Sequence, residues 1–221
     1  MKVKRQSFVL ITAAFAAAMM LSSCTTSEKA ATSATVPAAS TTGAKTLENL
    51  QTAFDGESNA NAKYSEFAKK ADAEGYTKVA SLFRAAARAE EIHLKNHAEV
   101  IKKMGGTPKA DIKLPEIKTT AENLKAAIEG ETYERDKMYV DFLAEARNVG
   151  NKDAVRTFNL AKAAEAEHAK LYGEALANLG SMKGGTTTYY VCSTCGYTTP
   201  DAKLEKCPVD FTTRDKFEEF K

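Results

Sequence analysis

The chain has 221 residues, with 31 lysines and arginines against 29 aspartates and glutamates, so its formal net charge is +2 at pH 7. A balance this close to neutral argues against nucleic acid as a partner. Of the four cysteines, one lies near the N-terminus and three lie close to the C-terminus. An odd, clustered set is a poor disulfide framework and a better metal site.

The first 23 residues have the pattern of a signal peptide. Lys2, Lys4 and Arg5 form a basic region, and residues 8–20 form an apolar run that is short for a membrane span. Leu-Ser-Ser-Cys at 21–24 resembles the bacterial lipobox, which implies cleavage before Cys24 and lipidation of its thiol. The alternative is an ordinary secretory signal with an incidental cysteine. We expect an exported protein, anchored by Cys24 to a bacterial membrane on its periplasmic or cell-surface side.

The segment after this signal reads as a flexible tether. Residues 24–45 are rich in serine, threonine and alanine and show no apolar period. The mature chain has 28 basic against 29 acidic residues, because cleavage removes three basic residues and no acidic ones. The membrane is therefore expected as a partner only through the lipid.

Residues 46–181 predict an all-α four-helix bundle. Alanine, glutamate, lysine and leucine dominate. Glycines mark the expected helix ends. The predicted helices are listed here by range: 46–74, 77–104, 119–148 and 151–179.

The two helix pairs resemble copies of one hairpin. Phe83, Glu90, His93 and Gly105 recur 75 residues later as Phe158, Glu165, His168 and Gly180, and Gly56-Glu57 recurs 74 residues later as Gly130-Glu131. Such self-similarity predicts a duplicated hairpin and a pseudo-twofold bundle.

Two Glu-x-x-His strings, at 90–93 and 165–168, are the most informative motifs. Residues i and i+3 share one helix face, so each string offers a carboxylate and an imidazole to one point. Counting from the turns at Gly75 and Gly150, we expect these strings to lie level with Glu57, Glu131 and Glu134, roughly 22–27 Å from a turn at about 1.5 Å per residue. A single such string usually lies on a solvated helix face, whereas two at matched offsets favour a dinuclear metal site.

The metal requirement follows from charge. Carboxylates suit iron and manganese, because they are hard, anionic and able to bridge. Burying them without a cation would cost several kcal/mol each.

The C-terminal segment, 189–221, follows a linker at 182–188 and is too small for a self-sufficient hydrophobic core. Cys192-x-x-Cys195-Gly is one knuckle of a rubredoxin-like site, where thiolates hold iron or zinc. The second knuckle should read Cys-Pro-x-Cys, but this chain has Cys207-Pro-Val-Asp210. Asp210 could ligate the metal, water could fill the fourth position, or the site could be metal-free with Cys192 and Cys195 in a disulfide. Ordinary rubredoxin-like electron transfer is therefore in doubt.

Residues 46–180 resemble the ferritin-like domain of the rubrerythrin family, and the cysteine segment resembles its rubredoxin-like tail. The motifs that carry the resemblance are Gly56-Glu57, Glu90-x-x-His93, Gly130-Glu131-x-x-Glu134 and Glu165-x-x-His168. The resemblance implies two non-haem irons bridged by Glu90 and Glu165. It also implies that Glu57 binds one iron, that Glu131 and His168 bind the other, and that His93 and Glu134 exchange at the first iron with redox state.

The same resemblance implies that Tyr64 and Tyr139 hydrogen-bond the ligand carboxylates, although both could simply pack in the core. His97, one turn after His93, has the spacing of a ligand, but no motif supports it. We expect a surface or packing role for this residue.

These features predict a non-haem di-iron peroxidase that reduces hydrogen peroxide to water. Electrons would come from a reduced donor protein through the cysteine site. The resemblance implies that this site approaches the di-iron centre of a second subunit, and hence a homodimer. The alternatives are iron oxidation and sequestration as in ferritins, and a structural lipoprotein with a relic site.

Overall fold

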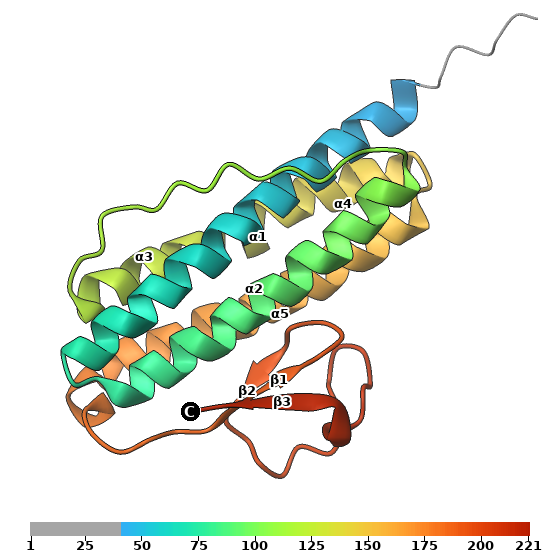
Figure 1. The fold of residues 1–221 in the computed structure, drawn as a ribbon. Helices are drawn as coiled ribbons and strands as arrows, with labels where there is room; N and C mark the ends of the chain where they lie inside the picture. The colour runs from blue at the N-terminus through green and yellow to red at the C-terminus, as the bar shows by residue number, and fades with distance from the viewer. Residues whose placement is uncertain (1–40) are drawn as a thin grey trace, which may run out of the picture. The chain divides into compact units, whose positions relative to one another are not determined.

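The computed structural model describes residues 41–221. The predicted signal peptide, Cys24 and most of the predicted tether lie outside these residues. The described chain is a helical bundle with a small antiparallel sheet beside it (Figure 1). The bundle elements are α1 (Thr41–Ala73), α2 (Thr77–Lys103), α3 (Thr120–Tyr133), η1 (Glu134–Met138), α4 (Tyr139–Asn148) and α5 (Lys152–Ala177).

Two helix boundaries differ from the prediction. Helix α1 begins at Thr41 rather than at residue 46, so the end of the predicted tether is helical. Ala44 and Lys45 favour helix, and extending an existing helix is far easier than starting one. The predicted third helix is interrupted by a π-helical turn, η1, in which the Tyr139 amide donates to the Glu134 carbonyl.

The helices pair through one tight turn and one long crossover. At the end of α1, Gly75 has φ +79°. The amide of Tyr76 donates to Ala71 O over 2.8 Å, which closes the turn into α2. Residues 104–119 then run along the outside of α1 (Figure 1), held where the Asp111 amide donates to Asp55 Oδ1 over 2.6 Å. This single crossover is typical of ferritin-like bundles.

Helix α3 begins with two sets of caps. Thr119 and Glu122 form a reciprocal capping box. Glu74, one residue beyond α1, also accepts from the amide and the hydroxyl of Thr120, at 2.8 and 2.7 Å. These bonds join the end of one hairpin to the start of the other.

The bundle interior contains two apolar clusters. One is centred on Tyr64, Phe67 and Phe83, and the other on Tyr139 and Phe158. Along α1, α2 and α5, buried glutamates and histidines lie between the members of these clusters. The apolar core is therefore split by a polar layer. Within residues 41–221, no helix combines the length and apolar character that crossing a bilayer requires.

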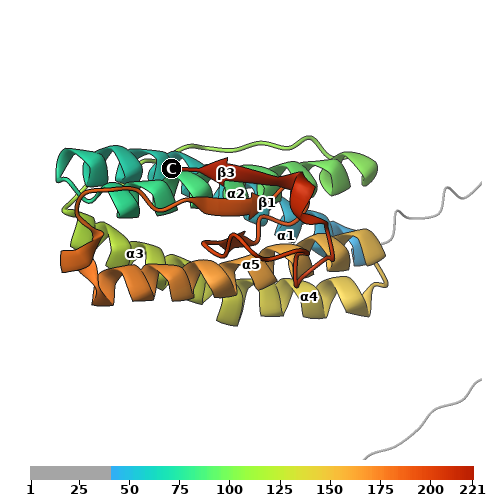
Figure 2. The same cartoon turned by 90° about the horizontal axis from the view of Figure 1, so that it is seen from below.

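The C-terminal segment forms a three-stranded antiparallel sheet of order β2-β1-β3, with β1 (Tyr189–Cys192), β2 (Thr198–Thr199) and β3 (Phe217–Phe220). Short 3₁₀ turns, η2 (Leu179–Met182) and η3 (Arg214–Lys216), precede β1 and β3. The sheet lies against α2 and α5 of the same chain (Figure 2). The linker is held at the start of α2, where Thr77 Oγ1 donates to Gly185 O over 2.6 Å. The guanidinium of Arg88 also donates two bonds to Glu218, at 2.8 and 2.7 Å.

Candidate metal centres

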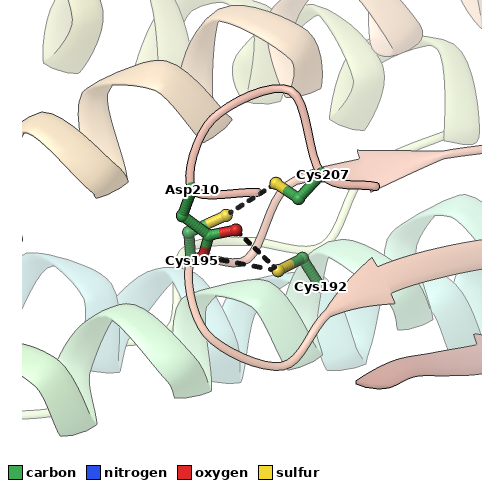
Figure 3. A group of neighbouring side chains, drawn as sticks. All are labelled: Cys192, Cys195, Cys207 and Asp210. Atoms are coloured by element: carbon green, nitrogen blue, oxygen red, sulfur yellow. Dashed lines mark hydrogen bonds between the residues drawn. The ribbon is translucent and has the colours of Figure 1, made fainter. Parts of the chain in front are cut away.

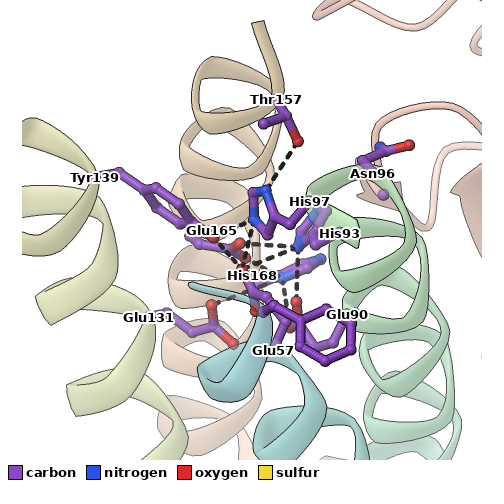
Figure 4. Close-up of polar contacts among 12 residues, drawn as sticks. Glu57, Glu90, His93, Asn96, His97, Glu131, Tyr139, Thr157, Glu165 and His168 are labelled. Atoms are coloured by element: carbon purple, nitrogen blue, oxygen red, sulfur yellow. Dashed lines mark hydrogen bonds and ion pairs between the residues drawn. The ribbon is translucent and has the colours of Figure 1, made fainter. Parts of the chain in front are cut away.

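The polar layer of the bundle contains six side chains, each no more than 1% exposed. They are Glu57 from α1, Glu90 and His93 from α2, Glu131 from α3, and Glu165 and His168 from α5. Their polar ends converge in the middle of the bundle (Figure 4). The predicted layer of carboxylates is therefore present, and it points inward.

The six side chains form two overlapping donor sets, within each of which one donor atom per residue lies within 4.8 Å of the others. One set contains Glu57 and His93, the other contains Glu131 and His168, and Glu90 and Glu165 belong to both. Two shared carboxylates between two single-carboxylate, single-imidazole sets make the arrangement of a dinuclear, carboxylate-bridged centre.

The hydrogen bonding of this layer fits two cations. Among residues 41–221, Glu57 Oε2, Glu90 Oε1, Glu131 Oε2, both Glu165 oxygens and His168 Nδ1 are buried with no hydrogen-bond partner. Buried polar atoms without partners are rare in proteins and call for an explanation. The four carboxylates of the two sets carry four negative charges, which two divalent cations neutralise. Hard oxygen donors with one imidazole each suit iron or manganese.

Proton affinities in the layer lead to the same conclusion. Burial, together with the charges of Glu90 and Glu165, raises the pKa of Glu131 to about 8. Burial acts against a charged His93, but the carboxylates of Glu165 and Glu90 outweigh it and raise the pKa of His93 well above its usual range. Without cations the layer therefore holds protons, which metal ions displace on binding.

Both histidines have their outer nitrogen bonded to the C-terminal segment. His93 Nε2 lies 2.9 Å from Cys195 O, and His168 Nε2 lies 3.1 Å from Thr198 Oγ1, whose hydroxyl donates onward to Gly196 O. Each Nε2 must therefore carry the proton. The Nδ1 lone pairs are then free and face the carboxylates, with His93 Nδ1 only 2.8 Å from Glu90 Oε2. Such outer bonds fix the tautomer that a metal ligand needs.

The two predicted tyrosines both reach ligand carboxylates. Tyr64 Oη donates to Glu131 Oε1 over 2.5 Å, and Tyr139 Oη donates to Glu57 Oε1. His97 is in neither donor set, but it is fully buried and bonds Tyr139 Oη through Nε2 at 3.0 Å. Sequence reasoning missed this contact and that of Thr157 with His97. A signal was available, because His97 lies one turn after His93 and thus on the same helix face.

Glu134 is not brought into either donor set. It begins the π-helical turn, is half-buried, and lines a solvent-facing pocket together with Gly56 and Lys63. Burial and the charge of Glu131 raise its pKa well above the usual range. The structure therefore has His93, and not Glu134, in the donor set that contains Glu57.

The cysteine site joins the three predicted thiols to Asp210 (Figure 3). All three cysteines are free and buried. Cys195 Sγ lies 3.4 Å from Cys207 Sγ, and Cys192 Sγ lies 3.6 Å from an oxygen of Asp210. Ligands about 2.3 Å from a tetrahedral metal stand about 3.8 Å apart, so this spacing fits a metal ion. Hydrogen bonds from the other two thiols lower the pKa of Cys192, which favours the thiolate that a metal binds.

The two knuckles share one backbone geometry. The Gly196 amide donates to Cys192 O over 2.9 Å, and the Phe211 amide donates to Cys207 O over 3.0 Å. Gly196 has φ +77° and Phe211 has φ +62°, an unusual value for a residue with a side chain. The second knuckle is thus retained although its last donor is a carboxylate. Of the three alternatives for this site, direct ligation by Asp210 is the one that the geometry favours.

Comparison with known proteins decides the family. A family model described as Rubrerythrin matches residues 48–176. Nigerythrin of Nitratidesulfovibrio vulgaris is 37% identical over 183 residues, which span 82% of this chain and 90% of that protein. The chain belongs to the rubrerythrin family. Rubrerythrin-2 of Clostridium acetobutylicum is 35% identical over 185 residues, covering 80% of this chain and 97% of that protein.

Solved structures confirm the ferritin-like fold with its rubredoxin-like tail. Nigerythrin in its fully reduced, all-ferrous state has a TM-score of 0.74 at 36% identity, over 79% of this chain and 86% of that one. A bacterioferritin from Desulfovibrio desulfuricans, at 22% identity and a TM-score of 0.62, shares the bundle fold. Rubrerythrins carry a di-iron centre and a rubredoxin-like metal site, and this chain has a donor set for each.

One expectation drawn from the rubrerythrin resemblance differs from the structure. The cysteine segment contacts the di-metal layer of its own chain, through His93 and Cys195, rather than that of a second subunit. The physical reason is the anchored linker: Gly184 N donates to Gly75 O over 3.1 Å, so β1 starts beside α2 and runs along it. The homodimer stays a prediction.

Proposed function

We propose that this chain is a peroxidase that reduces hydrogen peroxide to water and thereby protects against oxidative stress. Membership of the rubrerythrin family already makes it a di-iron protein of a family with an oxidative-stress role. The observation that carries the finer proposal is the bond between His93 Nε2 and Cys195 O. It joins an electron-transfer type of site directly to a donor of the di-metal layer, which an iron store does not need.

In this proposal Glu90 and Glu165 bridge the two irons. Glu57 and His93 complete one position, and Glu131 and His168 complete the other. When bound, the two ferrous ions supply the two electrons and the Lewis acidity that cleavage of the peroxide bond requires.

The protein residues position and balance this centre. Tyr64 and Tyr139 each hold one oxygen of a terminal carboxylate, so the other oxygen is left for metal. Glu134 lies one helical turn after Glu131 and offers a further negative charge when the positive charge of the centre rises on oxidation. Exchange of His93 for Glu134 is the redox-linked movement that we propose. The Cys192, Cys195, Cys207 and Asp210 site accepts electrons from a reduced partner protein.

The test is a rapid-mixing experiment on iron-loaded, prereduced full-length protein. The reaction consumes one peroxide, two electrons and two protons and yields two waters. At equal concentrations, we expect the ferrous protein to be oxidised faster by hydrogen peroxide than by oxygen. Equal or slower oxidation by peroxide would contradict the proposal.

A cysteine variant separates the two metal sites. With Cys192→Ser, we expect the single oxidation by peroxide to persist, while repeated turnover with an electron donor is lost. Loss of neither would show that electrons enter elsewhere. Many irons per chain in a large cage, instead of two or three irons per chain in a small oligomer, would favour the ferritin-like alternative.

We also propose that the mature protein is held at a bacterial membrane by lipid on Cys24, as the preceding basic and apolar residues indicate. In cells fed a labelled fatty acid, the wild-type chain should carry label and sediment with membranes. Cys24→Ala should do neither, and a labelled variant would contradict the assignment.

A further inference from the structure

His97 belongs to a hydrogen-bonded chain that ends on Glu57. Its Nδ1 lies 2.9 Å from Thr157 Oγ1, its Nε2 lies 3.0 Å from Tyr139 Oη, and the Tyr139 hydroxyl reaches Glu57 Oε1 (Figure 4). Tyr139 and His97 are fully buried, and Thr157 is 5% exposed. These are polar groups in the middle of an apolar cluster, where each unmade bond is costly.

The directions of these bonds follow from the number of protons. A carboxylate that binds metal only accepts, so the single hydroxyl proton of Tyr139 goes to Glu57. Tyr139 Oη must then accept from His97, which places the imidazole proton on Nε2. His97 Nδ1 is left as an acceptor, so the Thr157 hydroxyl donates to it. Every bond points toward Glu57, and aligned hydrogen bonds strengthen one another.

The second half of the duplicated bundle lacks this chain. The 75-residue offset that relates Tyr64 to Tyr139 also relates His97 to Tyr172 and Leu82 to Thr157. Tyr172 is buried against Tyr64, with ring centroids 5.6 Å apart, and its hydroxyl has no hydrogen-bond partner among residues 41–221. The ligands obey the repeat, but the groups behind the two tyrosines do not.

We propose that His97, oriented by Thr157, is a positioning residue that fixes the Tyr139 hydroxyl on Glu57 Oε1 and so makes the Glu57 metal position different from the Glu131 position. Oε2 of Glu57 is then the single oxygen directed at metal, held by three successive bonds. Glu131 is held by one tyrosine alone. The inference rests on the metal-ligand roles in the proposed function, but not on peroxidase activity.

The test is an anaerobic titration of the metal-free full-length protein with Co²⁺ alone, followed by visible absorption and calorimetry. Wild type should bind two ions in the layer. His97→Leu should weaken one of the two ions by about tenfold, as loss of a partner behind a ligand does, and leave the other unchanged. Thr157→Val, which is almost the same shape and removes only the outermost donor, should weaken the same ion by a smaller factor.

Two further variants separate positioning from packing. His97→Gln keeps a donor for Tyr139 and an acceptor for Thr157, so it should restore most of the affinity. Tyr172→Phe, at the matching position of the repeat, should leave both ions unchanged. The iron-loaded His97→Leu protein should also show a changed Mössbauer signal for only one iron.

Equal weakening of both ions in His97→Leu, or wild-type binding in both His97→Leu and Thr157→Val, would overturn the inference. If His97→Leu fails to fold, Thr157→Val decides alone. Fewer than two ions in the layer of wild type would overturn the proposed function, and this inference with it. Normal two-ion binding without peroxidase activity would leave the inference standing.

Discussion

A carboxylate in place of a fourth thiolate changes the chemistry of the cysteine site at the scale of one residue. Asp210 lies with three sulfurs at spacings that suit a tetrahedral ion, and its Oδ1 accepts from the Thr212 amide over 2.9 Å. The charge of four thiolates is retained, but one donor is hard oxygen. Such a donor stabilises the ferric form less through covalent bonding and also suits zinc.

Asp210→Cys should turn this site into an ordinary four-sulfur site. We expect the charge-transfer absorption of the ferric protein in the visible region to rise by roughly one third, in proportion to the number of thiolates bound. Asp210→Ala should keep the three-sulfur spectrum and bind iron more weakly. An unchanged spectrum in both variants would show that Asp210 is not a ligand.

Gly196 controls how closely the two metal sites approach. A Cβ built on it would lie 2.4 Å from His93 Nε2, and its φ of +77° already disfavours any other residue. Only a glycine lets Cys195 O reach the imidazole.

Gly196→Ala should therefore separate the cysteine segment from His93. We expect slower reduction of the bundle irons through the cysteine site, with the single oxidation by peroxide unchanged. The matched control is Gly75→Ala, where φ is +79° but no atom counted among the described residues lies within 4 Å of the added Cβ. It should lose about 1 kcal/mol of stability through the same backbone strain and transfer electrons normally.

At the scale of elements, the π-helical turn explains an irregularity in the repeat. Seven residues separate Glu57 from Tyr64, whereas eight separate Glu131 from Tyr139. The extra residue falls in η1, whose wider turn absorbs it and brings Tyr139 back to the side that faces Glu57. The change of offset from 74 to 75 is therefore the sequence record of this turn.

The contact between α1 and α3 should depend on pH through Glu74. Hydrogen bonds from Thr120 lower the pKa of Glu74 to about 2. A pKa below the usual 4.5 means that ionised Glu74 stabilises the fold above pH 4.5, and that this contribution is lost as pH falls toward 2.

Glu74→Gln should therefore lower the free energy of unfolding by about 1–2 kcal/mol at pH 7, a figure reduced for its partial exposure. The difference from wild type should shrink between pH 4.5 and 2. Denaturant unfolding at several pH values measures it, with the exposed Glu129→Gln on α3 as the control. A difference that is constant with pH would exclude the ionised carboxylate as the cause.

Local rules made most of the bundle and its ligands predictable. Glu-x-x-His spacing, glycine stops and the repeat predicted which side chains meet, because each depends on a few neighbouring residues. The π-helical turn was not predicted, since one extra residue can be absorbed in several ways. The bond from His97 to Tyr139 and the docking of the sheet on its own bundle depend on contacts between distant segments, which no local spacing records.

At the scale of the whole molecule, the sheet is held to the bundle by a few polar anchors around the His93 contact. Arg88 on α2 binds Glu218 on β3 through two bonds, and Asn96 donates to Thr194 O over 2.9 Å. The Arg88 side chain is 22% exposed and that of Glu218 39%, so water weakens the pair only in part.

Glu218→Gln should weaken docking by about 0.5–1 kcal/mol, because a two-bond ion pair becomes a single neutral contact. Amide hydrogen exchange in β3 should then be roughly two to five times faster. The exchanged pair Arg88→Glu with Glu218→Arg should recover part of the loss, and Glu219→Gln should have no effect. Exchange that matches wild type in Glu218→Gln would show that other contacts hold the sheet.

The anchored linker has a consequence for how the protein works in a population. Since each polypeptide folds its thiol-bearing tail onto its own helices, a solitary molecule already contains the full route from electron entry to the buried glutamates. Specific activity should then stay constant on dilution, and molecules scattered sparsely over a surface would be as competent as crowded ones.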